Sequence, residues 1–399
     1  MYENMAILAV FVLVYSLIAG RVDKMPLSGS MIYVAFGLLM GPVVLGALDF
    51  NIDTEGIRTL AELTLAFVLF TDAANANLGV LRKTYGLPVR LLLIGLPLTI
   101  LAGFGVGLAL FRDLTWFEVA ILATMLAPTD AALGKAVVEN EAVPGKIREG
   151  LNVESGLNDG ICVPILFTFL ALATESNAGG STAGLAARLV AQEIGIGVAV
   201  GLGLTLIGGG LLKTCVERGW ITDVWSRIPI VALSVSCFAV AQVFGGSGFI
   251  AAFSGGLFFG ALWKQHKARF LEAAEGTGDT FALLTWVVFG AAVVGQAIGR
   301  LSLPVLGYAV LSLTLVRMVP VALSVVGLGL NMESKLFLGW FGPRGLASIV
   351  FAIIVVNANL AGGDTITAVV VWTITLSILA HGVSANPLSK AYGRMMSQS

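Results

Sequence analysis

The chain has 399 residues and a formal net charge of −1; 57% of its residues are hydrophobic and only 12% are charged. A typical soluble domain carries about 25% charged residues, so this composition cannot cover a water-exposed surface and predicts an all-α polytopic membrane protein. It excludes a nucleic-acid-binding protein, because no basic stripe is present, and a disulfide scaffold, because there are only three cysteines.

The N-terminus is predicted to be a retained first helix and not a signal peptide. Glu3 stands where a basic segment would precede the apolar run, and Arg21 and Lys24 follow that run. We expect residues 1–399 to form a single membrane domain with no soluble domain. Thirteen apolar segments predict membrane-spanning helices near 5–20, 28–48, 57–73, 88–110, 116–137, 147–173, 184–212, 228–244, 247–264, 279–299, 302–326, 333–357 and 365–387.

Lysines and arginines in the connecting segments predict the orientation. With the N-terminus outside, 17 of them fall in inside loops and 4 in outside loops. Cytoplasmic loops carry an excess of these residues, so the bias favours an outside N-terminus, a cytoplasmic C-terminus and an odd number of helices.

The first polar interruption of an apolar segment is Ala127-Pro128-Thr129-Asp130, within the fifth predicted helix. Pro128 removes a backbone donor and disrupts the helix, which leaves backbone groups unpaired at membrane depth. Such groups are tolerated where they line a cavity or bind an ion. Thr129 adds a hydroxyl and Asp130 a charge, so the segment predicts an ion site. The alternative is a proline kink with an aspartate that reaches the membrane surface.

The sixth predicted helix carries a second polar cluster, at residues 152–159. Glu154 and Asn158 are four residues apart, as are Ser155 and Asp159, so all four side chains lie on one face. Two carboxylates, an amide and a hydroxyl make an oxygen-rich surface that suits a hard cation. The alternative is a polar seam between helices.

The twelfth predicted helix is interrupted by Phe341-Gly342-Pro343-Arg344-Gly345. Two broken helices at matching places in two halves of a chain point to a transporter binding site. We therefore predict inverted six-helix repeats, with the discontinuous helices near Thr129-Asp130 and Pro343-Arg344. The first repeat would cover 1–173 (helices 1–6), the linking helix 184–212, and the second repeat 228–387 (helices 8–13).

Two arginines fall inside apolar segments, where a charge needs a buried partner. Arg317 is expected to pair with Glu154, because Asp130 and Asp159 are assigned to the ion; pairing with a loop acid is the alternative. Arg344 is expected to compensate charge at the second interruption, or else to reach the membrane surface.

A carboxylate in a broken-helix cavity holds a cation or a proton, but not readily both. If its access alternates between the two membrane faces, it exchanges one for the other. No nucleotide-binding loop is present, so no nucleotide is expected as a partner. An intramembrane aspartyl protease using Asp130 and Asp159, and a cation channel, are the alternatives. A histidine proton shuttle is disfavoured, because His266 and His381 are expected to lie away from the acidic cluster.

Together these motifs resemble a known family. Leu-Ala-Pro-Thr-Asp-Ala-Ala-Leu-Gly (126–134) and Leu-Asn-Val-Glu-Ser-Gly-Leu-Asn-Asp-Gly (151–160) are similar to segments of the monovalent cation/proton antiporters, the bacterial and archaeal sodium/proton exchangers related to those of animals. Residues 68–83 are similar to that family's third helix and the inside loop after it. The resemblance extends over essentially the whole chain.

The resemblance implies that the protein is an antiporter and not an enzyme. The antiporter would exchange Na⁺, or else Li⁺ or K⁺, for H⁺ without a cofactor. It implies a homodimer of thirteen-helix protomers, each moving its ion by an elevator-like motion of a six-helix core. Asp159 would carry the cation and the proton. The other residues that it places at the cation and proton site are Thr129, Asp130, Glu154, Ser155 and Asn158.

Further details follow from the same resemblance. Asn158 stands where electrogenic relatives have a second aspartate, which implies electroneutral exchange. Arg317 resembles the arginine that pairs with the glutamate of helix six, and Arg344 the arginine of the second broken helix. The second interruption departs from the family in having Pro343 before the arginine, where many relatives have leucine. A compact chain without added domains suggests a prokaryotic inner membrane.

Overall fold

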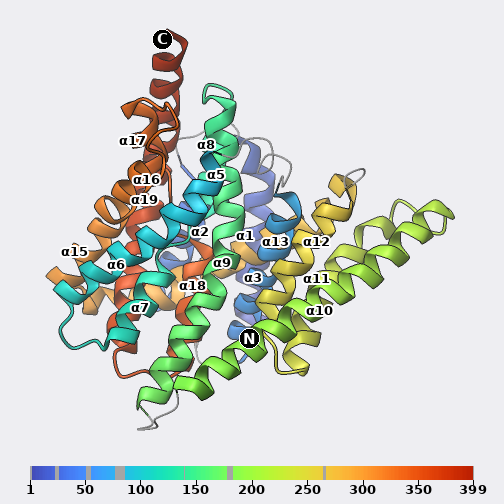
Figure 1. The fold of residues 1–399 in the computed structure, drawn as a ribbon, viewed down its shortest axis with the longest axis horizontal. Coiled ribbons are helices and arrows are strands. Elements are labelled where there is room, and N and C mark those ends of the chain that lie inside the picture. Colours follow the sequence, from blue (N-terminus) through green and yellow to red (C-terminus); the bar gives the residue numbers. More distant parts are fainter. Residues whose placement is uncertain are drawn as a thin grey trace. The chain divides into compact units, whose positions relative to one another are not determined.

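The computed structural model describes residues 2–22, 27–50, 55–76, 86–138, 140–177, 183–263 and 267–398, and every regular element among them is a helix (Figure 1). Within these ranges, eight helices are long and apolar enough to cross a membrane, and four shorter apolar ones accompany them. The count of thirteen spans stays a prediction. Several residues considered above lie outside the described residues: Lys24, residues 77–83, Lys264 and His266.

The chain forms two compact units and passes between them within three helices, α3 (Glu55–Asn75), α9 (Gly145–Asn177) and α13 (Lys267–Val288), and once more before Gly86. Unit 1 comprises Met1–Arg58, Gly86–Ser155 and Leu283–Ser399, and unit 2 comprises Thr59–Tyr85 and Gly156–Ala282.

Unit 1 contains the two interrupted helices. Its helices, with π-helical and 3-10 turns marked η, are α1 (Tyr2–Val22), α2 (Gly29–Met40), α5 (Leu87–Arg90), η1 (Leu91–Gly95), α6 (Leu96–Leu110), α7 (Trp116–Met125), α8 (Ala131–Val138), the first part of α9 (Gly145–Asn177), the end of α13 (Lys267–Val288), η3 (Phe289–Val294), α14 (Gly295–Ala297), η4 (Ile298–Arg300), α15 (Leu303–Leu313), α16 (Leu315–Ser324), α17 (Met332–Trp340), α18 (Leu346–Asn357) and α19 (Gly363–Gln398).

Unit 2 is built on long helices with many small residues. It contains most of α3 (Glu55–Asn75), the remainder of α9, α10 (Ala183–Glu217), η2 (Trp225–Arg227), α11 (Pro229–Val243), α12 (Gly248–Leu262) and most of α13.

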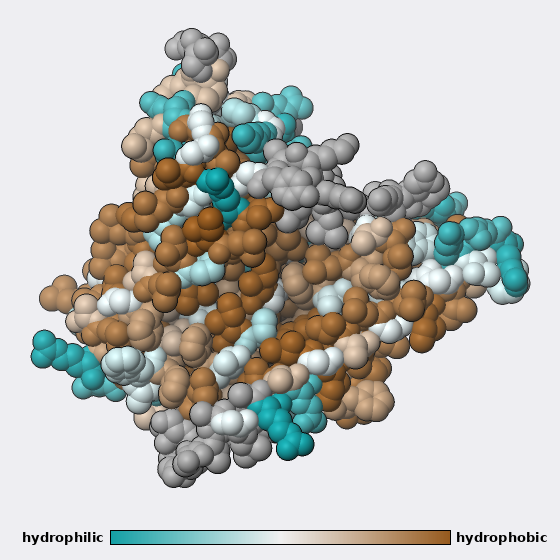
Figure 2. Space-filling model, viewed as in Figure 1, coloured by the Kyte–Doolittle hydropathy of each residue, from teal (hydrophilic) through white to brown (hydrophobic). Residues whose placement is uncertain are grey.

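The surface suits a lipid environment. Most of the face drawn in Figure 2 is hydrophobic. On α1 only Val22 is buried, while Leu13 is 60% and Leu17 78% exposed. Apolar side chains at this exposure belong in a bilayer and not in water.

Irregular stretches of the helices have local causes. Pro97 has no N–H to donate to the carbonyl four residues before it, and the turn ahead of it is π-helical, with Leu96 N–H donating to the carbonyl of Leu91. The segment predicted as one helix over 302–326 is interrupted at Thr314, whose φ of −114° and ψ of −98° are not helical. Arg317 therefore lies in the first turn of α16 and not in the middle of a long helix.

Glycines let the backbones of α3 and α12 approach closely in unit 2. A Cβ on Gly256 would lie 2.2 Å from the carbonyl oxygen of Phe70, and one on Gly260 would lie 2.3 Å from that of Ala74. No real side chain tolerates such distances, so Gly256-x-x-x-Gly260 is a helix contact, as its spacing predicts.

We predict that Gly256→Ala lowers the free energy of unfolding by about 1–3 kcal/mol, because two backbones must separate to admit a methyl group. The matched control is Gly203→Ala in α10, where a Cβ meets no atom within 4 Å. That change should be neutral or stabilising by roughly 0.4–1 kcal/mol. Melting temperatures in detergent compare the two, and equal values for both variants would contradict the close approach.

Candidate functional site

Two helices of unit 1 are broken where the sequence predicts it. The first break is residues 126–130, between the end of α7 and the start of α8, and the second is residues 341–345, between α17 and α18. Each break contains a proline, Pro128 or Pro343, which supplies no N–H to continue the helix. Both breaks are buried in the structure.

Asp130 links the first break to the second break by hydrogen bonds. Its Oδ2 accepts a hydrogen bond of 2.7 Å from the N–H of Leu346, the first residue of α18, and its Oδ1 accepts one of 2.9 Å from the N–H of Leu133 in α8. Its own N–H donates to the carbonyl of Pro343 at 2.8 Å. One carboxylate thus receives N–H groups from the N-termini of two helices, where negative charge is favoured.

Side chains at the second break also donate hydrogen bonds to the first break. The Nη1 of Arg344 donates to the carbonyl oxygens of Ala127 and Pro128, at 3.1 and 3.2 Å. The hydroxyl of Ser348 donates to the carbonyl of Met125 at 2.7 Å. Arg344 is fully buried. The positive side chain therefore pairs carbonyls that the broken helix leaves without helical partners.

No side chain is tolerated at Gly345. A Cβ built there would lie 2.0 Å from Oδ2 of Asp130. The glycine is thus required for the carboxylate to reach the N-terminus of α18.

Glu154 and Arg317 form a buried ion pair within unit 1. The Nη1 and Nη2 of Arg317 donate to Oε1 and Oε2 of Glu154 at 2.6 and 2.7 Å, and both side chains are 1% exposed. The fork of the guanidinium matches the two carboxylate oxygens. The interruption at Thr314 places Arg317 in the turn that begins α16, a feature that the sequence does not signal.

The first break also contacts α9. The hydroxyls of Thr129 and Ser155 lie 2.9 Å apart, and either can donate. Both side chains are buried, at 1% and 7% exposure. Of the eight predicted site residues, unit 1 therefore brings together Thr129, Asp130, Glu154, Ser155, Arg317 and Arg344.

Asn158 and Asp159 belong to unit 2, and both are buried. They continue α9 one turn beyond Glu154 and Ser155, on the same helical face. In unit 2, Gly160 next to Asp159 leaves room for the ring of Phe253, which a Cβ there would meet at 2.2 Å.

The predicted site offers oxygen atoms as possible ligands for a cation. Among the described residues, no group of three or more His, Cys, Asp or Glu side chains is placed to hold a metal ion. The site offers single carboxylates together with hydroxyl and backbone carbonyl oxygens. Oxygen ligands of this kind suit hard cations.

Glu118 is a buried carboxylate that the sequence reasoning missed. It is 1% exposed; its Oε2 accepts from the N–H and the hydroxyl of Thr115, and its Oε1 from the N–H of Gly362 at 2.7 Å. It joins the start of α7 to the loop before α19. The spacing Thr115-x-x-Glu118 is a capping box, which is the signal that could have identified it.

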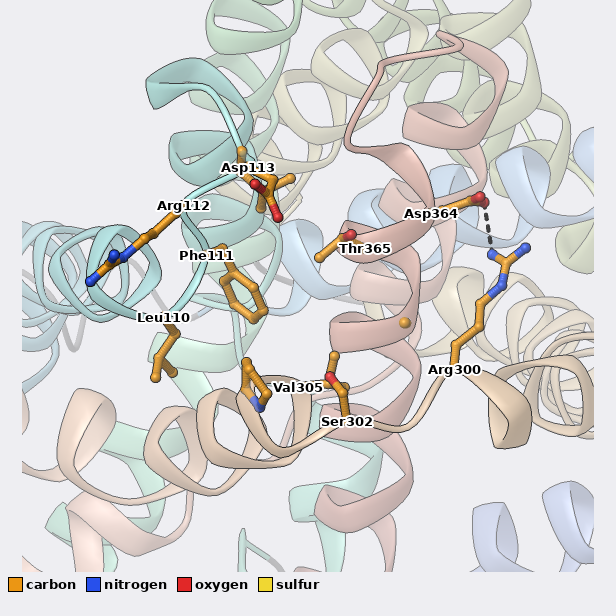
Figure 3. A pocket seen from close by; sticks show the side chains of 12 residues that line it. Leu110, Phe111, Arg112, Asp113, Arg300, Ser302, Val305, Asp364 and Thr365 are labelled. Carbon is orange, nitrogen blue, oxygen red and sulfur yellow. Dashed lines mark hydrogen bonds and ion pairs between the residues drawn. The ribbon is translucent and has the colours of Figure 1, made fainter.

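A pocket of about 460 Å³ lies beside the start of α19 (Figure 3). Arg300 and Asp364 meet in its wall at 2.7 Å, and both are exposed. Its lining includes none of the eight predicted site residues among those the structure describes. The pocket is thus separate from the helix breaks.

Comparison with known proteins identifies the family of this chain. The profile of the family described as sodium/hydrogen exchanger, transmembrane, matches residues 7–391. The chain belongs to the sodium/hydrogen exchanger family. The sodium proton antiporter MjNhaP1 from Methanocaldococcus jannaschii has a solved structure that matches with a TM-score of 0.75, at 20% identity and over 97% of each chain. This likeness confirms the predicted fold class, an all-α multi-pass membrane protein.

Curated relatives of this chain are longer than it. The K⁺/H⁺ antiporter NhaP2 of Shewanella sp. (strain ANA-3) is 24% identical over 355 residues, which are 89% of this chain and 61% of the relative. The K⁺/H⁺ antiporter NhaP of Alkalimonas amylolytica is 24% identical over 394 residues, covering 97% of this chain and 67% of the relative. The chain thus spans about three fifths of the length of NhaP2.

We predict that Glu154→Gln and Arg317→Ala each lower the free energy of unfolding by roughly 3–5 kcal/mol, because each leaves the other charge buried without its partner. The double variant should lose much less than the sum of the two, since it leaves no stranded charge. Melting temperatures in detergent measure all three. Strictly additive losses would show that the pair contributes nothing beyond its separate residues.

Proposed function

We propose that this protein is a secondary active transporter that exchanges a monovalent cation, Na⁺ foremost, for H⁺ by alternating access. The observation that carries the proposal is the pair of helix breaks that satisfy one another through Asp130 and Arg344, in a chain of the sodium/hydrogen exchanger family. Broken helices that meet at buried charges are the construction from which transporters build ion sites.

Asp159 is the residue for which cation and proton compete in this proposal. It is a carboxylate 7% exposed, on the oxygen-rich face of α9. In general, a bound cation favours the ionised form of a carboxylate, whereas burial without a cation favours the protonated form. The two ligands therefore exclude one another, which is what obligatory exchange requires.

The neighbouring polar residues shape the site in different ways. The hydroxyl oxygens of Thr129 and Ser155 lie 2.9 Å apart. We therefore assign each hydroxyl either as a ligand of the cation or as the group that holds the other hydroxyl in place. Asp130 contributes negative charge, while its carboxylate oxygens accept hydrogen bonds from the backbone N–H groups of Leu346 and Leu133. Glu154 is held by Arg317, so its role is to compensate that arginine and to support the site, and not to carry the proton.

Potassium is the second candidate cation. The relatives from Shewanella and Alkalimonas are named as K⁺/H⁺ antiporters, whereas the structural neighbour is named as a sodium proton antiporter. Carboxylate, hydroxyl and carbonyl oxygens suit both ions. Transport assays that compare Na⁺, Li⁺ and K⁺ against a pH gradient decide between them.

We also propose the setting in which the exchanger works. The excess of lysine and arginine in alternate loops supports an outside N-terminus and a cytoplasmic C-terminus. The membrane that we propose is a prokaryotic inner membrane. The two breaks support inverted repeats over 1–173 and 228–387, joined by 184–212. The family resemblance supports a homodimer, and the exposed apolar surface of α1 is available to lipid or to a second copy.

We predict that Asp159→Asn abolishes cation/proton exchange in proteoliposomes, because an amide keeps the shape of the side chain but cannot titrate. The matched control is Asp364→Asn, which removes an exposed carboxylate outside the helix breaks and should leave exchange near the wild-type rate. Exchange by Asp159→Asn at the wild-type rate would exclude Asp159 as the carrier.

We predict that exchange is electroneutral, because Asn158 offers no second titrating carboxylate beside Asp159. A membrane potential of 100 mV biases each net charge moved by about 2.3 kcal/mol, so electrogenic exchange would respond clearly to it. The measurement is the initial rate in proteoliposomes with and without an imposed potassium diffusion potential, using Na⁺ as the transported ion. A rate that changes severalfold with the potential would overturn this stoichiometry.

A further inference from the structure

Two side chains of α19, Ser377 and His381, lie one helical turn apart and contact the backbone at the second helix break. The backbone N–H of Arg344 donates to Ser377 Oγ at 2.7 Å, and His381 Nε2 lies 2.8 Å from the carbonyl oxygen of Trp340. Ser377 is fully buried and His381 is 1% exposed. The sequence motifs assign neither of them to the ion site, and the expectation for His381 concerns only its separation from the acidic cluster.

These contacts satisfy backbone groups on both sides of the break. Trp340 is the last residue of α17, and Arg344 lies two residues before α18 begins. A carbonyl only accepts hydrogen bonds, so the Nε2 of His381 carries the hydrogen in its contact with Trp340. One face of α19 thus supplies a donor for the carbonyl before the break and an acceptor for the N–H within it.

The two contacts are linked to one another. The Nδ1 of His381 lies 3.2 Å from the hydroxyl oxygen and 2.9 Å from the carbonyl oxygen of Ser377. Either the hydroxyl donates to Nδ1 or a protonated Nδ1 donates to the carbonyl, and both arrangements join His381 to Ser377. Trp340 is held a second time, since its indole Nε1 donates to Ser384 Oγ at 2.9 Å.

We propose that Ser377 and His381 are positioning residues for the ion site. Together they fix the backbone from Trp340 to Arg344, so that the guanidinium of Arg344 reaches the carbonyls of the first break. They act through Arg344 and do not contact the transported ion. The effect on transport rests on the proposed cation/proton exchange, whereas the effect on the backbone of the break does not.

An apolar side chain at either position would fill the space without replacing the bonds. In His381→Leu the Trp340 carbonyl loses its donor from α19 and keeps the N–H of Gly342, at 2.8 Å. In Ser377→Ala the N–H of Arg344 loses its acceptor. Buried polar groups that lose a partner destabilise the conformation that buries them, so the break should open locally.

The experiment compares four variants of the full chain. His381→Leu and Ser377→Ala remove the bonds, while His381→Gln keeps a side-chain N–H donor and an acceptor. The control is Thr375→Val on the same helix, whose hydroxyl bonds only its own helix, to the carbonyl of Val371. Two quantities are measured: amide hydrogen exchange over residues 336–350 in detergent, and the apparent affinity for Na⁺ against the maximal rate in proteoliposomes.

We expect faster amide exchange at the break in His381→Leu and Ser377→Ala, with Thr375→Val like the wild type. The apparent affinity for Na⁺ should fall by roughly 10- to 100-fold, as for other residues that orient ligands, and His381→Gln should recover most of it. Wild-type amide exchange at the break in both His381→Leu and Ser377→Ala would overturn the proposal.

The remaining outcomes are also decisive. If the wild-type protein exchanges no cation, the proposed function fails, while amide exchange at the break still tests the positioning role. If His381→Leu fails to fold, Ser377→Ala and His381→Gln decide. Amide exchange that rises equally throughout the chain in Ser377→Ala, without a maximum at residues 341–346, would show a general packing role and overturn the proposal.

Discussion

The central constraint is that a helix broken inside a membrane must find partners for the backbone groups it exposes, because lipid offers none. Here each break supplies what the other lacks: Asp130 accepts from the N–H that begins α18, and Arg344 donates to the carbonyls of residues 127 and 128. Neither break is stable without the other in this arrangement. The charges at the breaks therefore bond the exposed backbone groups, and the proposed ion site is built on the framework that these bonds make.

The same constraint explains the distribution of charge. Of the five ionisable residues singled out in the apolar segments, Asp130, Glu154 and Asp159 are acids and Arg317 and Arg344 are bases, which leaves a nominal net charge of −1. Within unit 1, Arg317 forms an ion pair with Glu154. Arg344 donates to a carbonyl of the first break, which Asp130 joins to the start of α18. In the proposed exchange, one monovalent cation or one proton would neutralise this excess. This balance is the basis of the proposal that exchange is electroneutral.

Much of this framework could be predicted from the sequence, because proline, glycine and charge within apolar segments are strong local signals. Pro128 and Pro343 mark both breaks, and a buried Arg317 requires an acid such as Glu154. The interruption at Thr314 was not predicted, because no glycine or proline lies within five residues of it to mark a break. Ser377 and His381 were missed because serine and histidine in an apolar helix carry no signature. Their role exists only where α19 meets a break more than 30 residues away in the chain.

Competition between cation and proton for one buried carboxylate is tested most directly by proton release. Na⁺, Li⁺ or K⁺ is added to the purified protein in weakly buffered detergent solution that contains a pH indicator, with Asp159→Asn as the reference. We predict saturable release of about one proton per chain by the wild-type protein, with an apparent cation affinity that weakens up to about tenfold per unit of falling pH, the limit for one exchanged proton. Saturable cation binding without proton release would contradict the exchange mechanism.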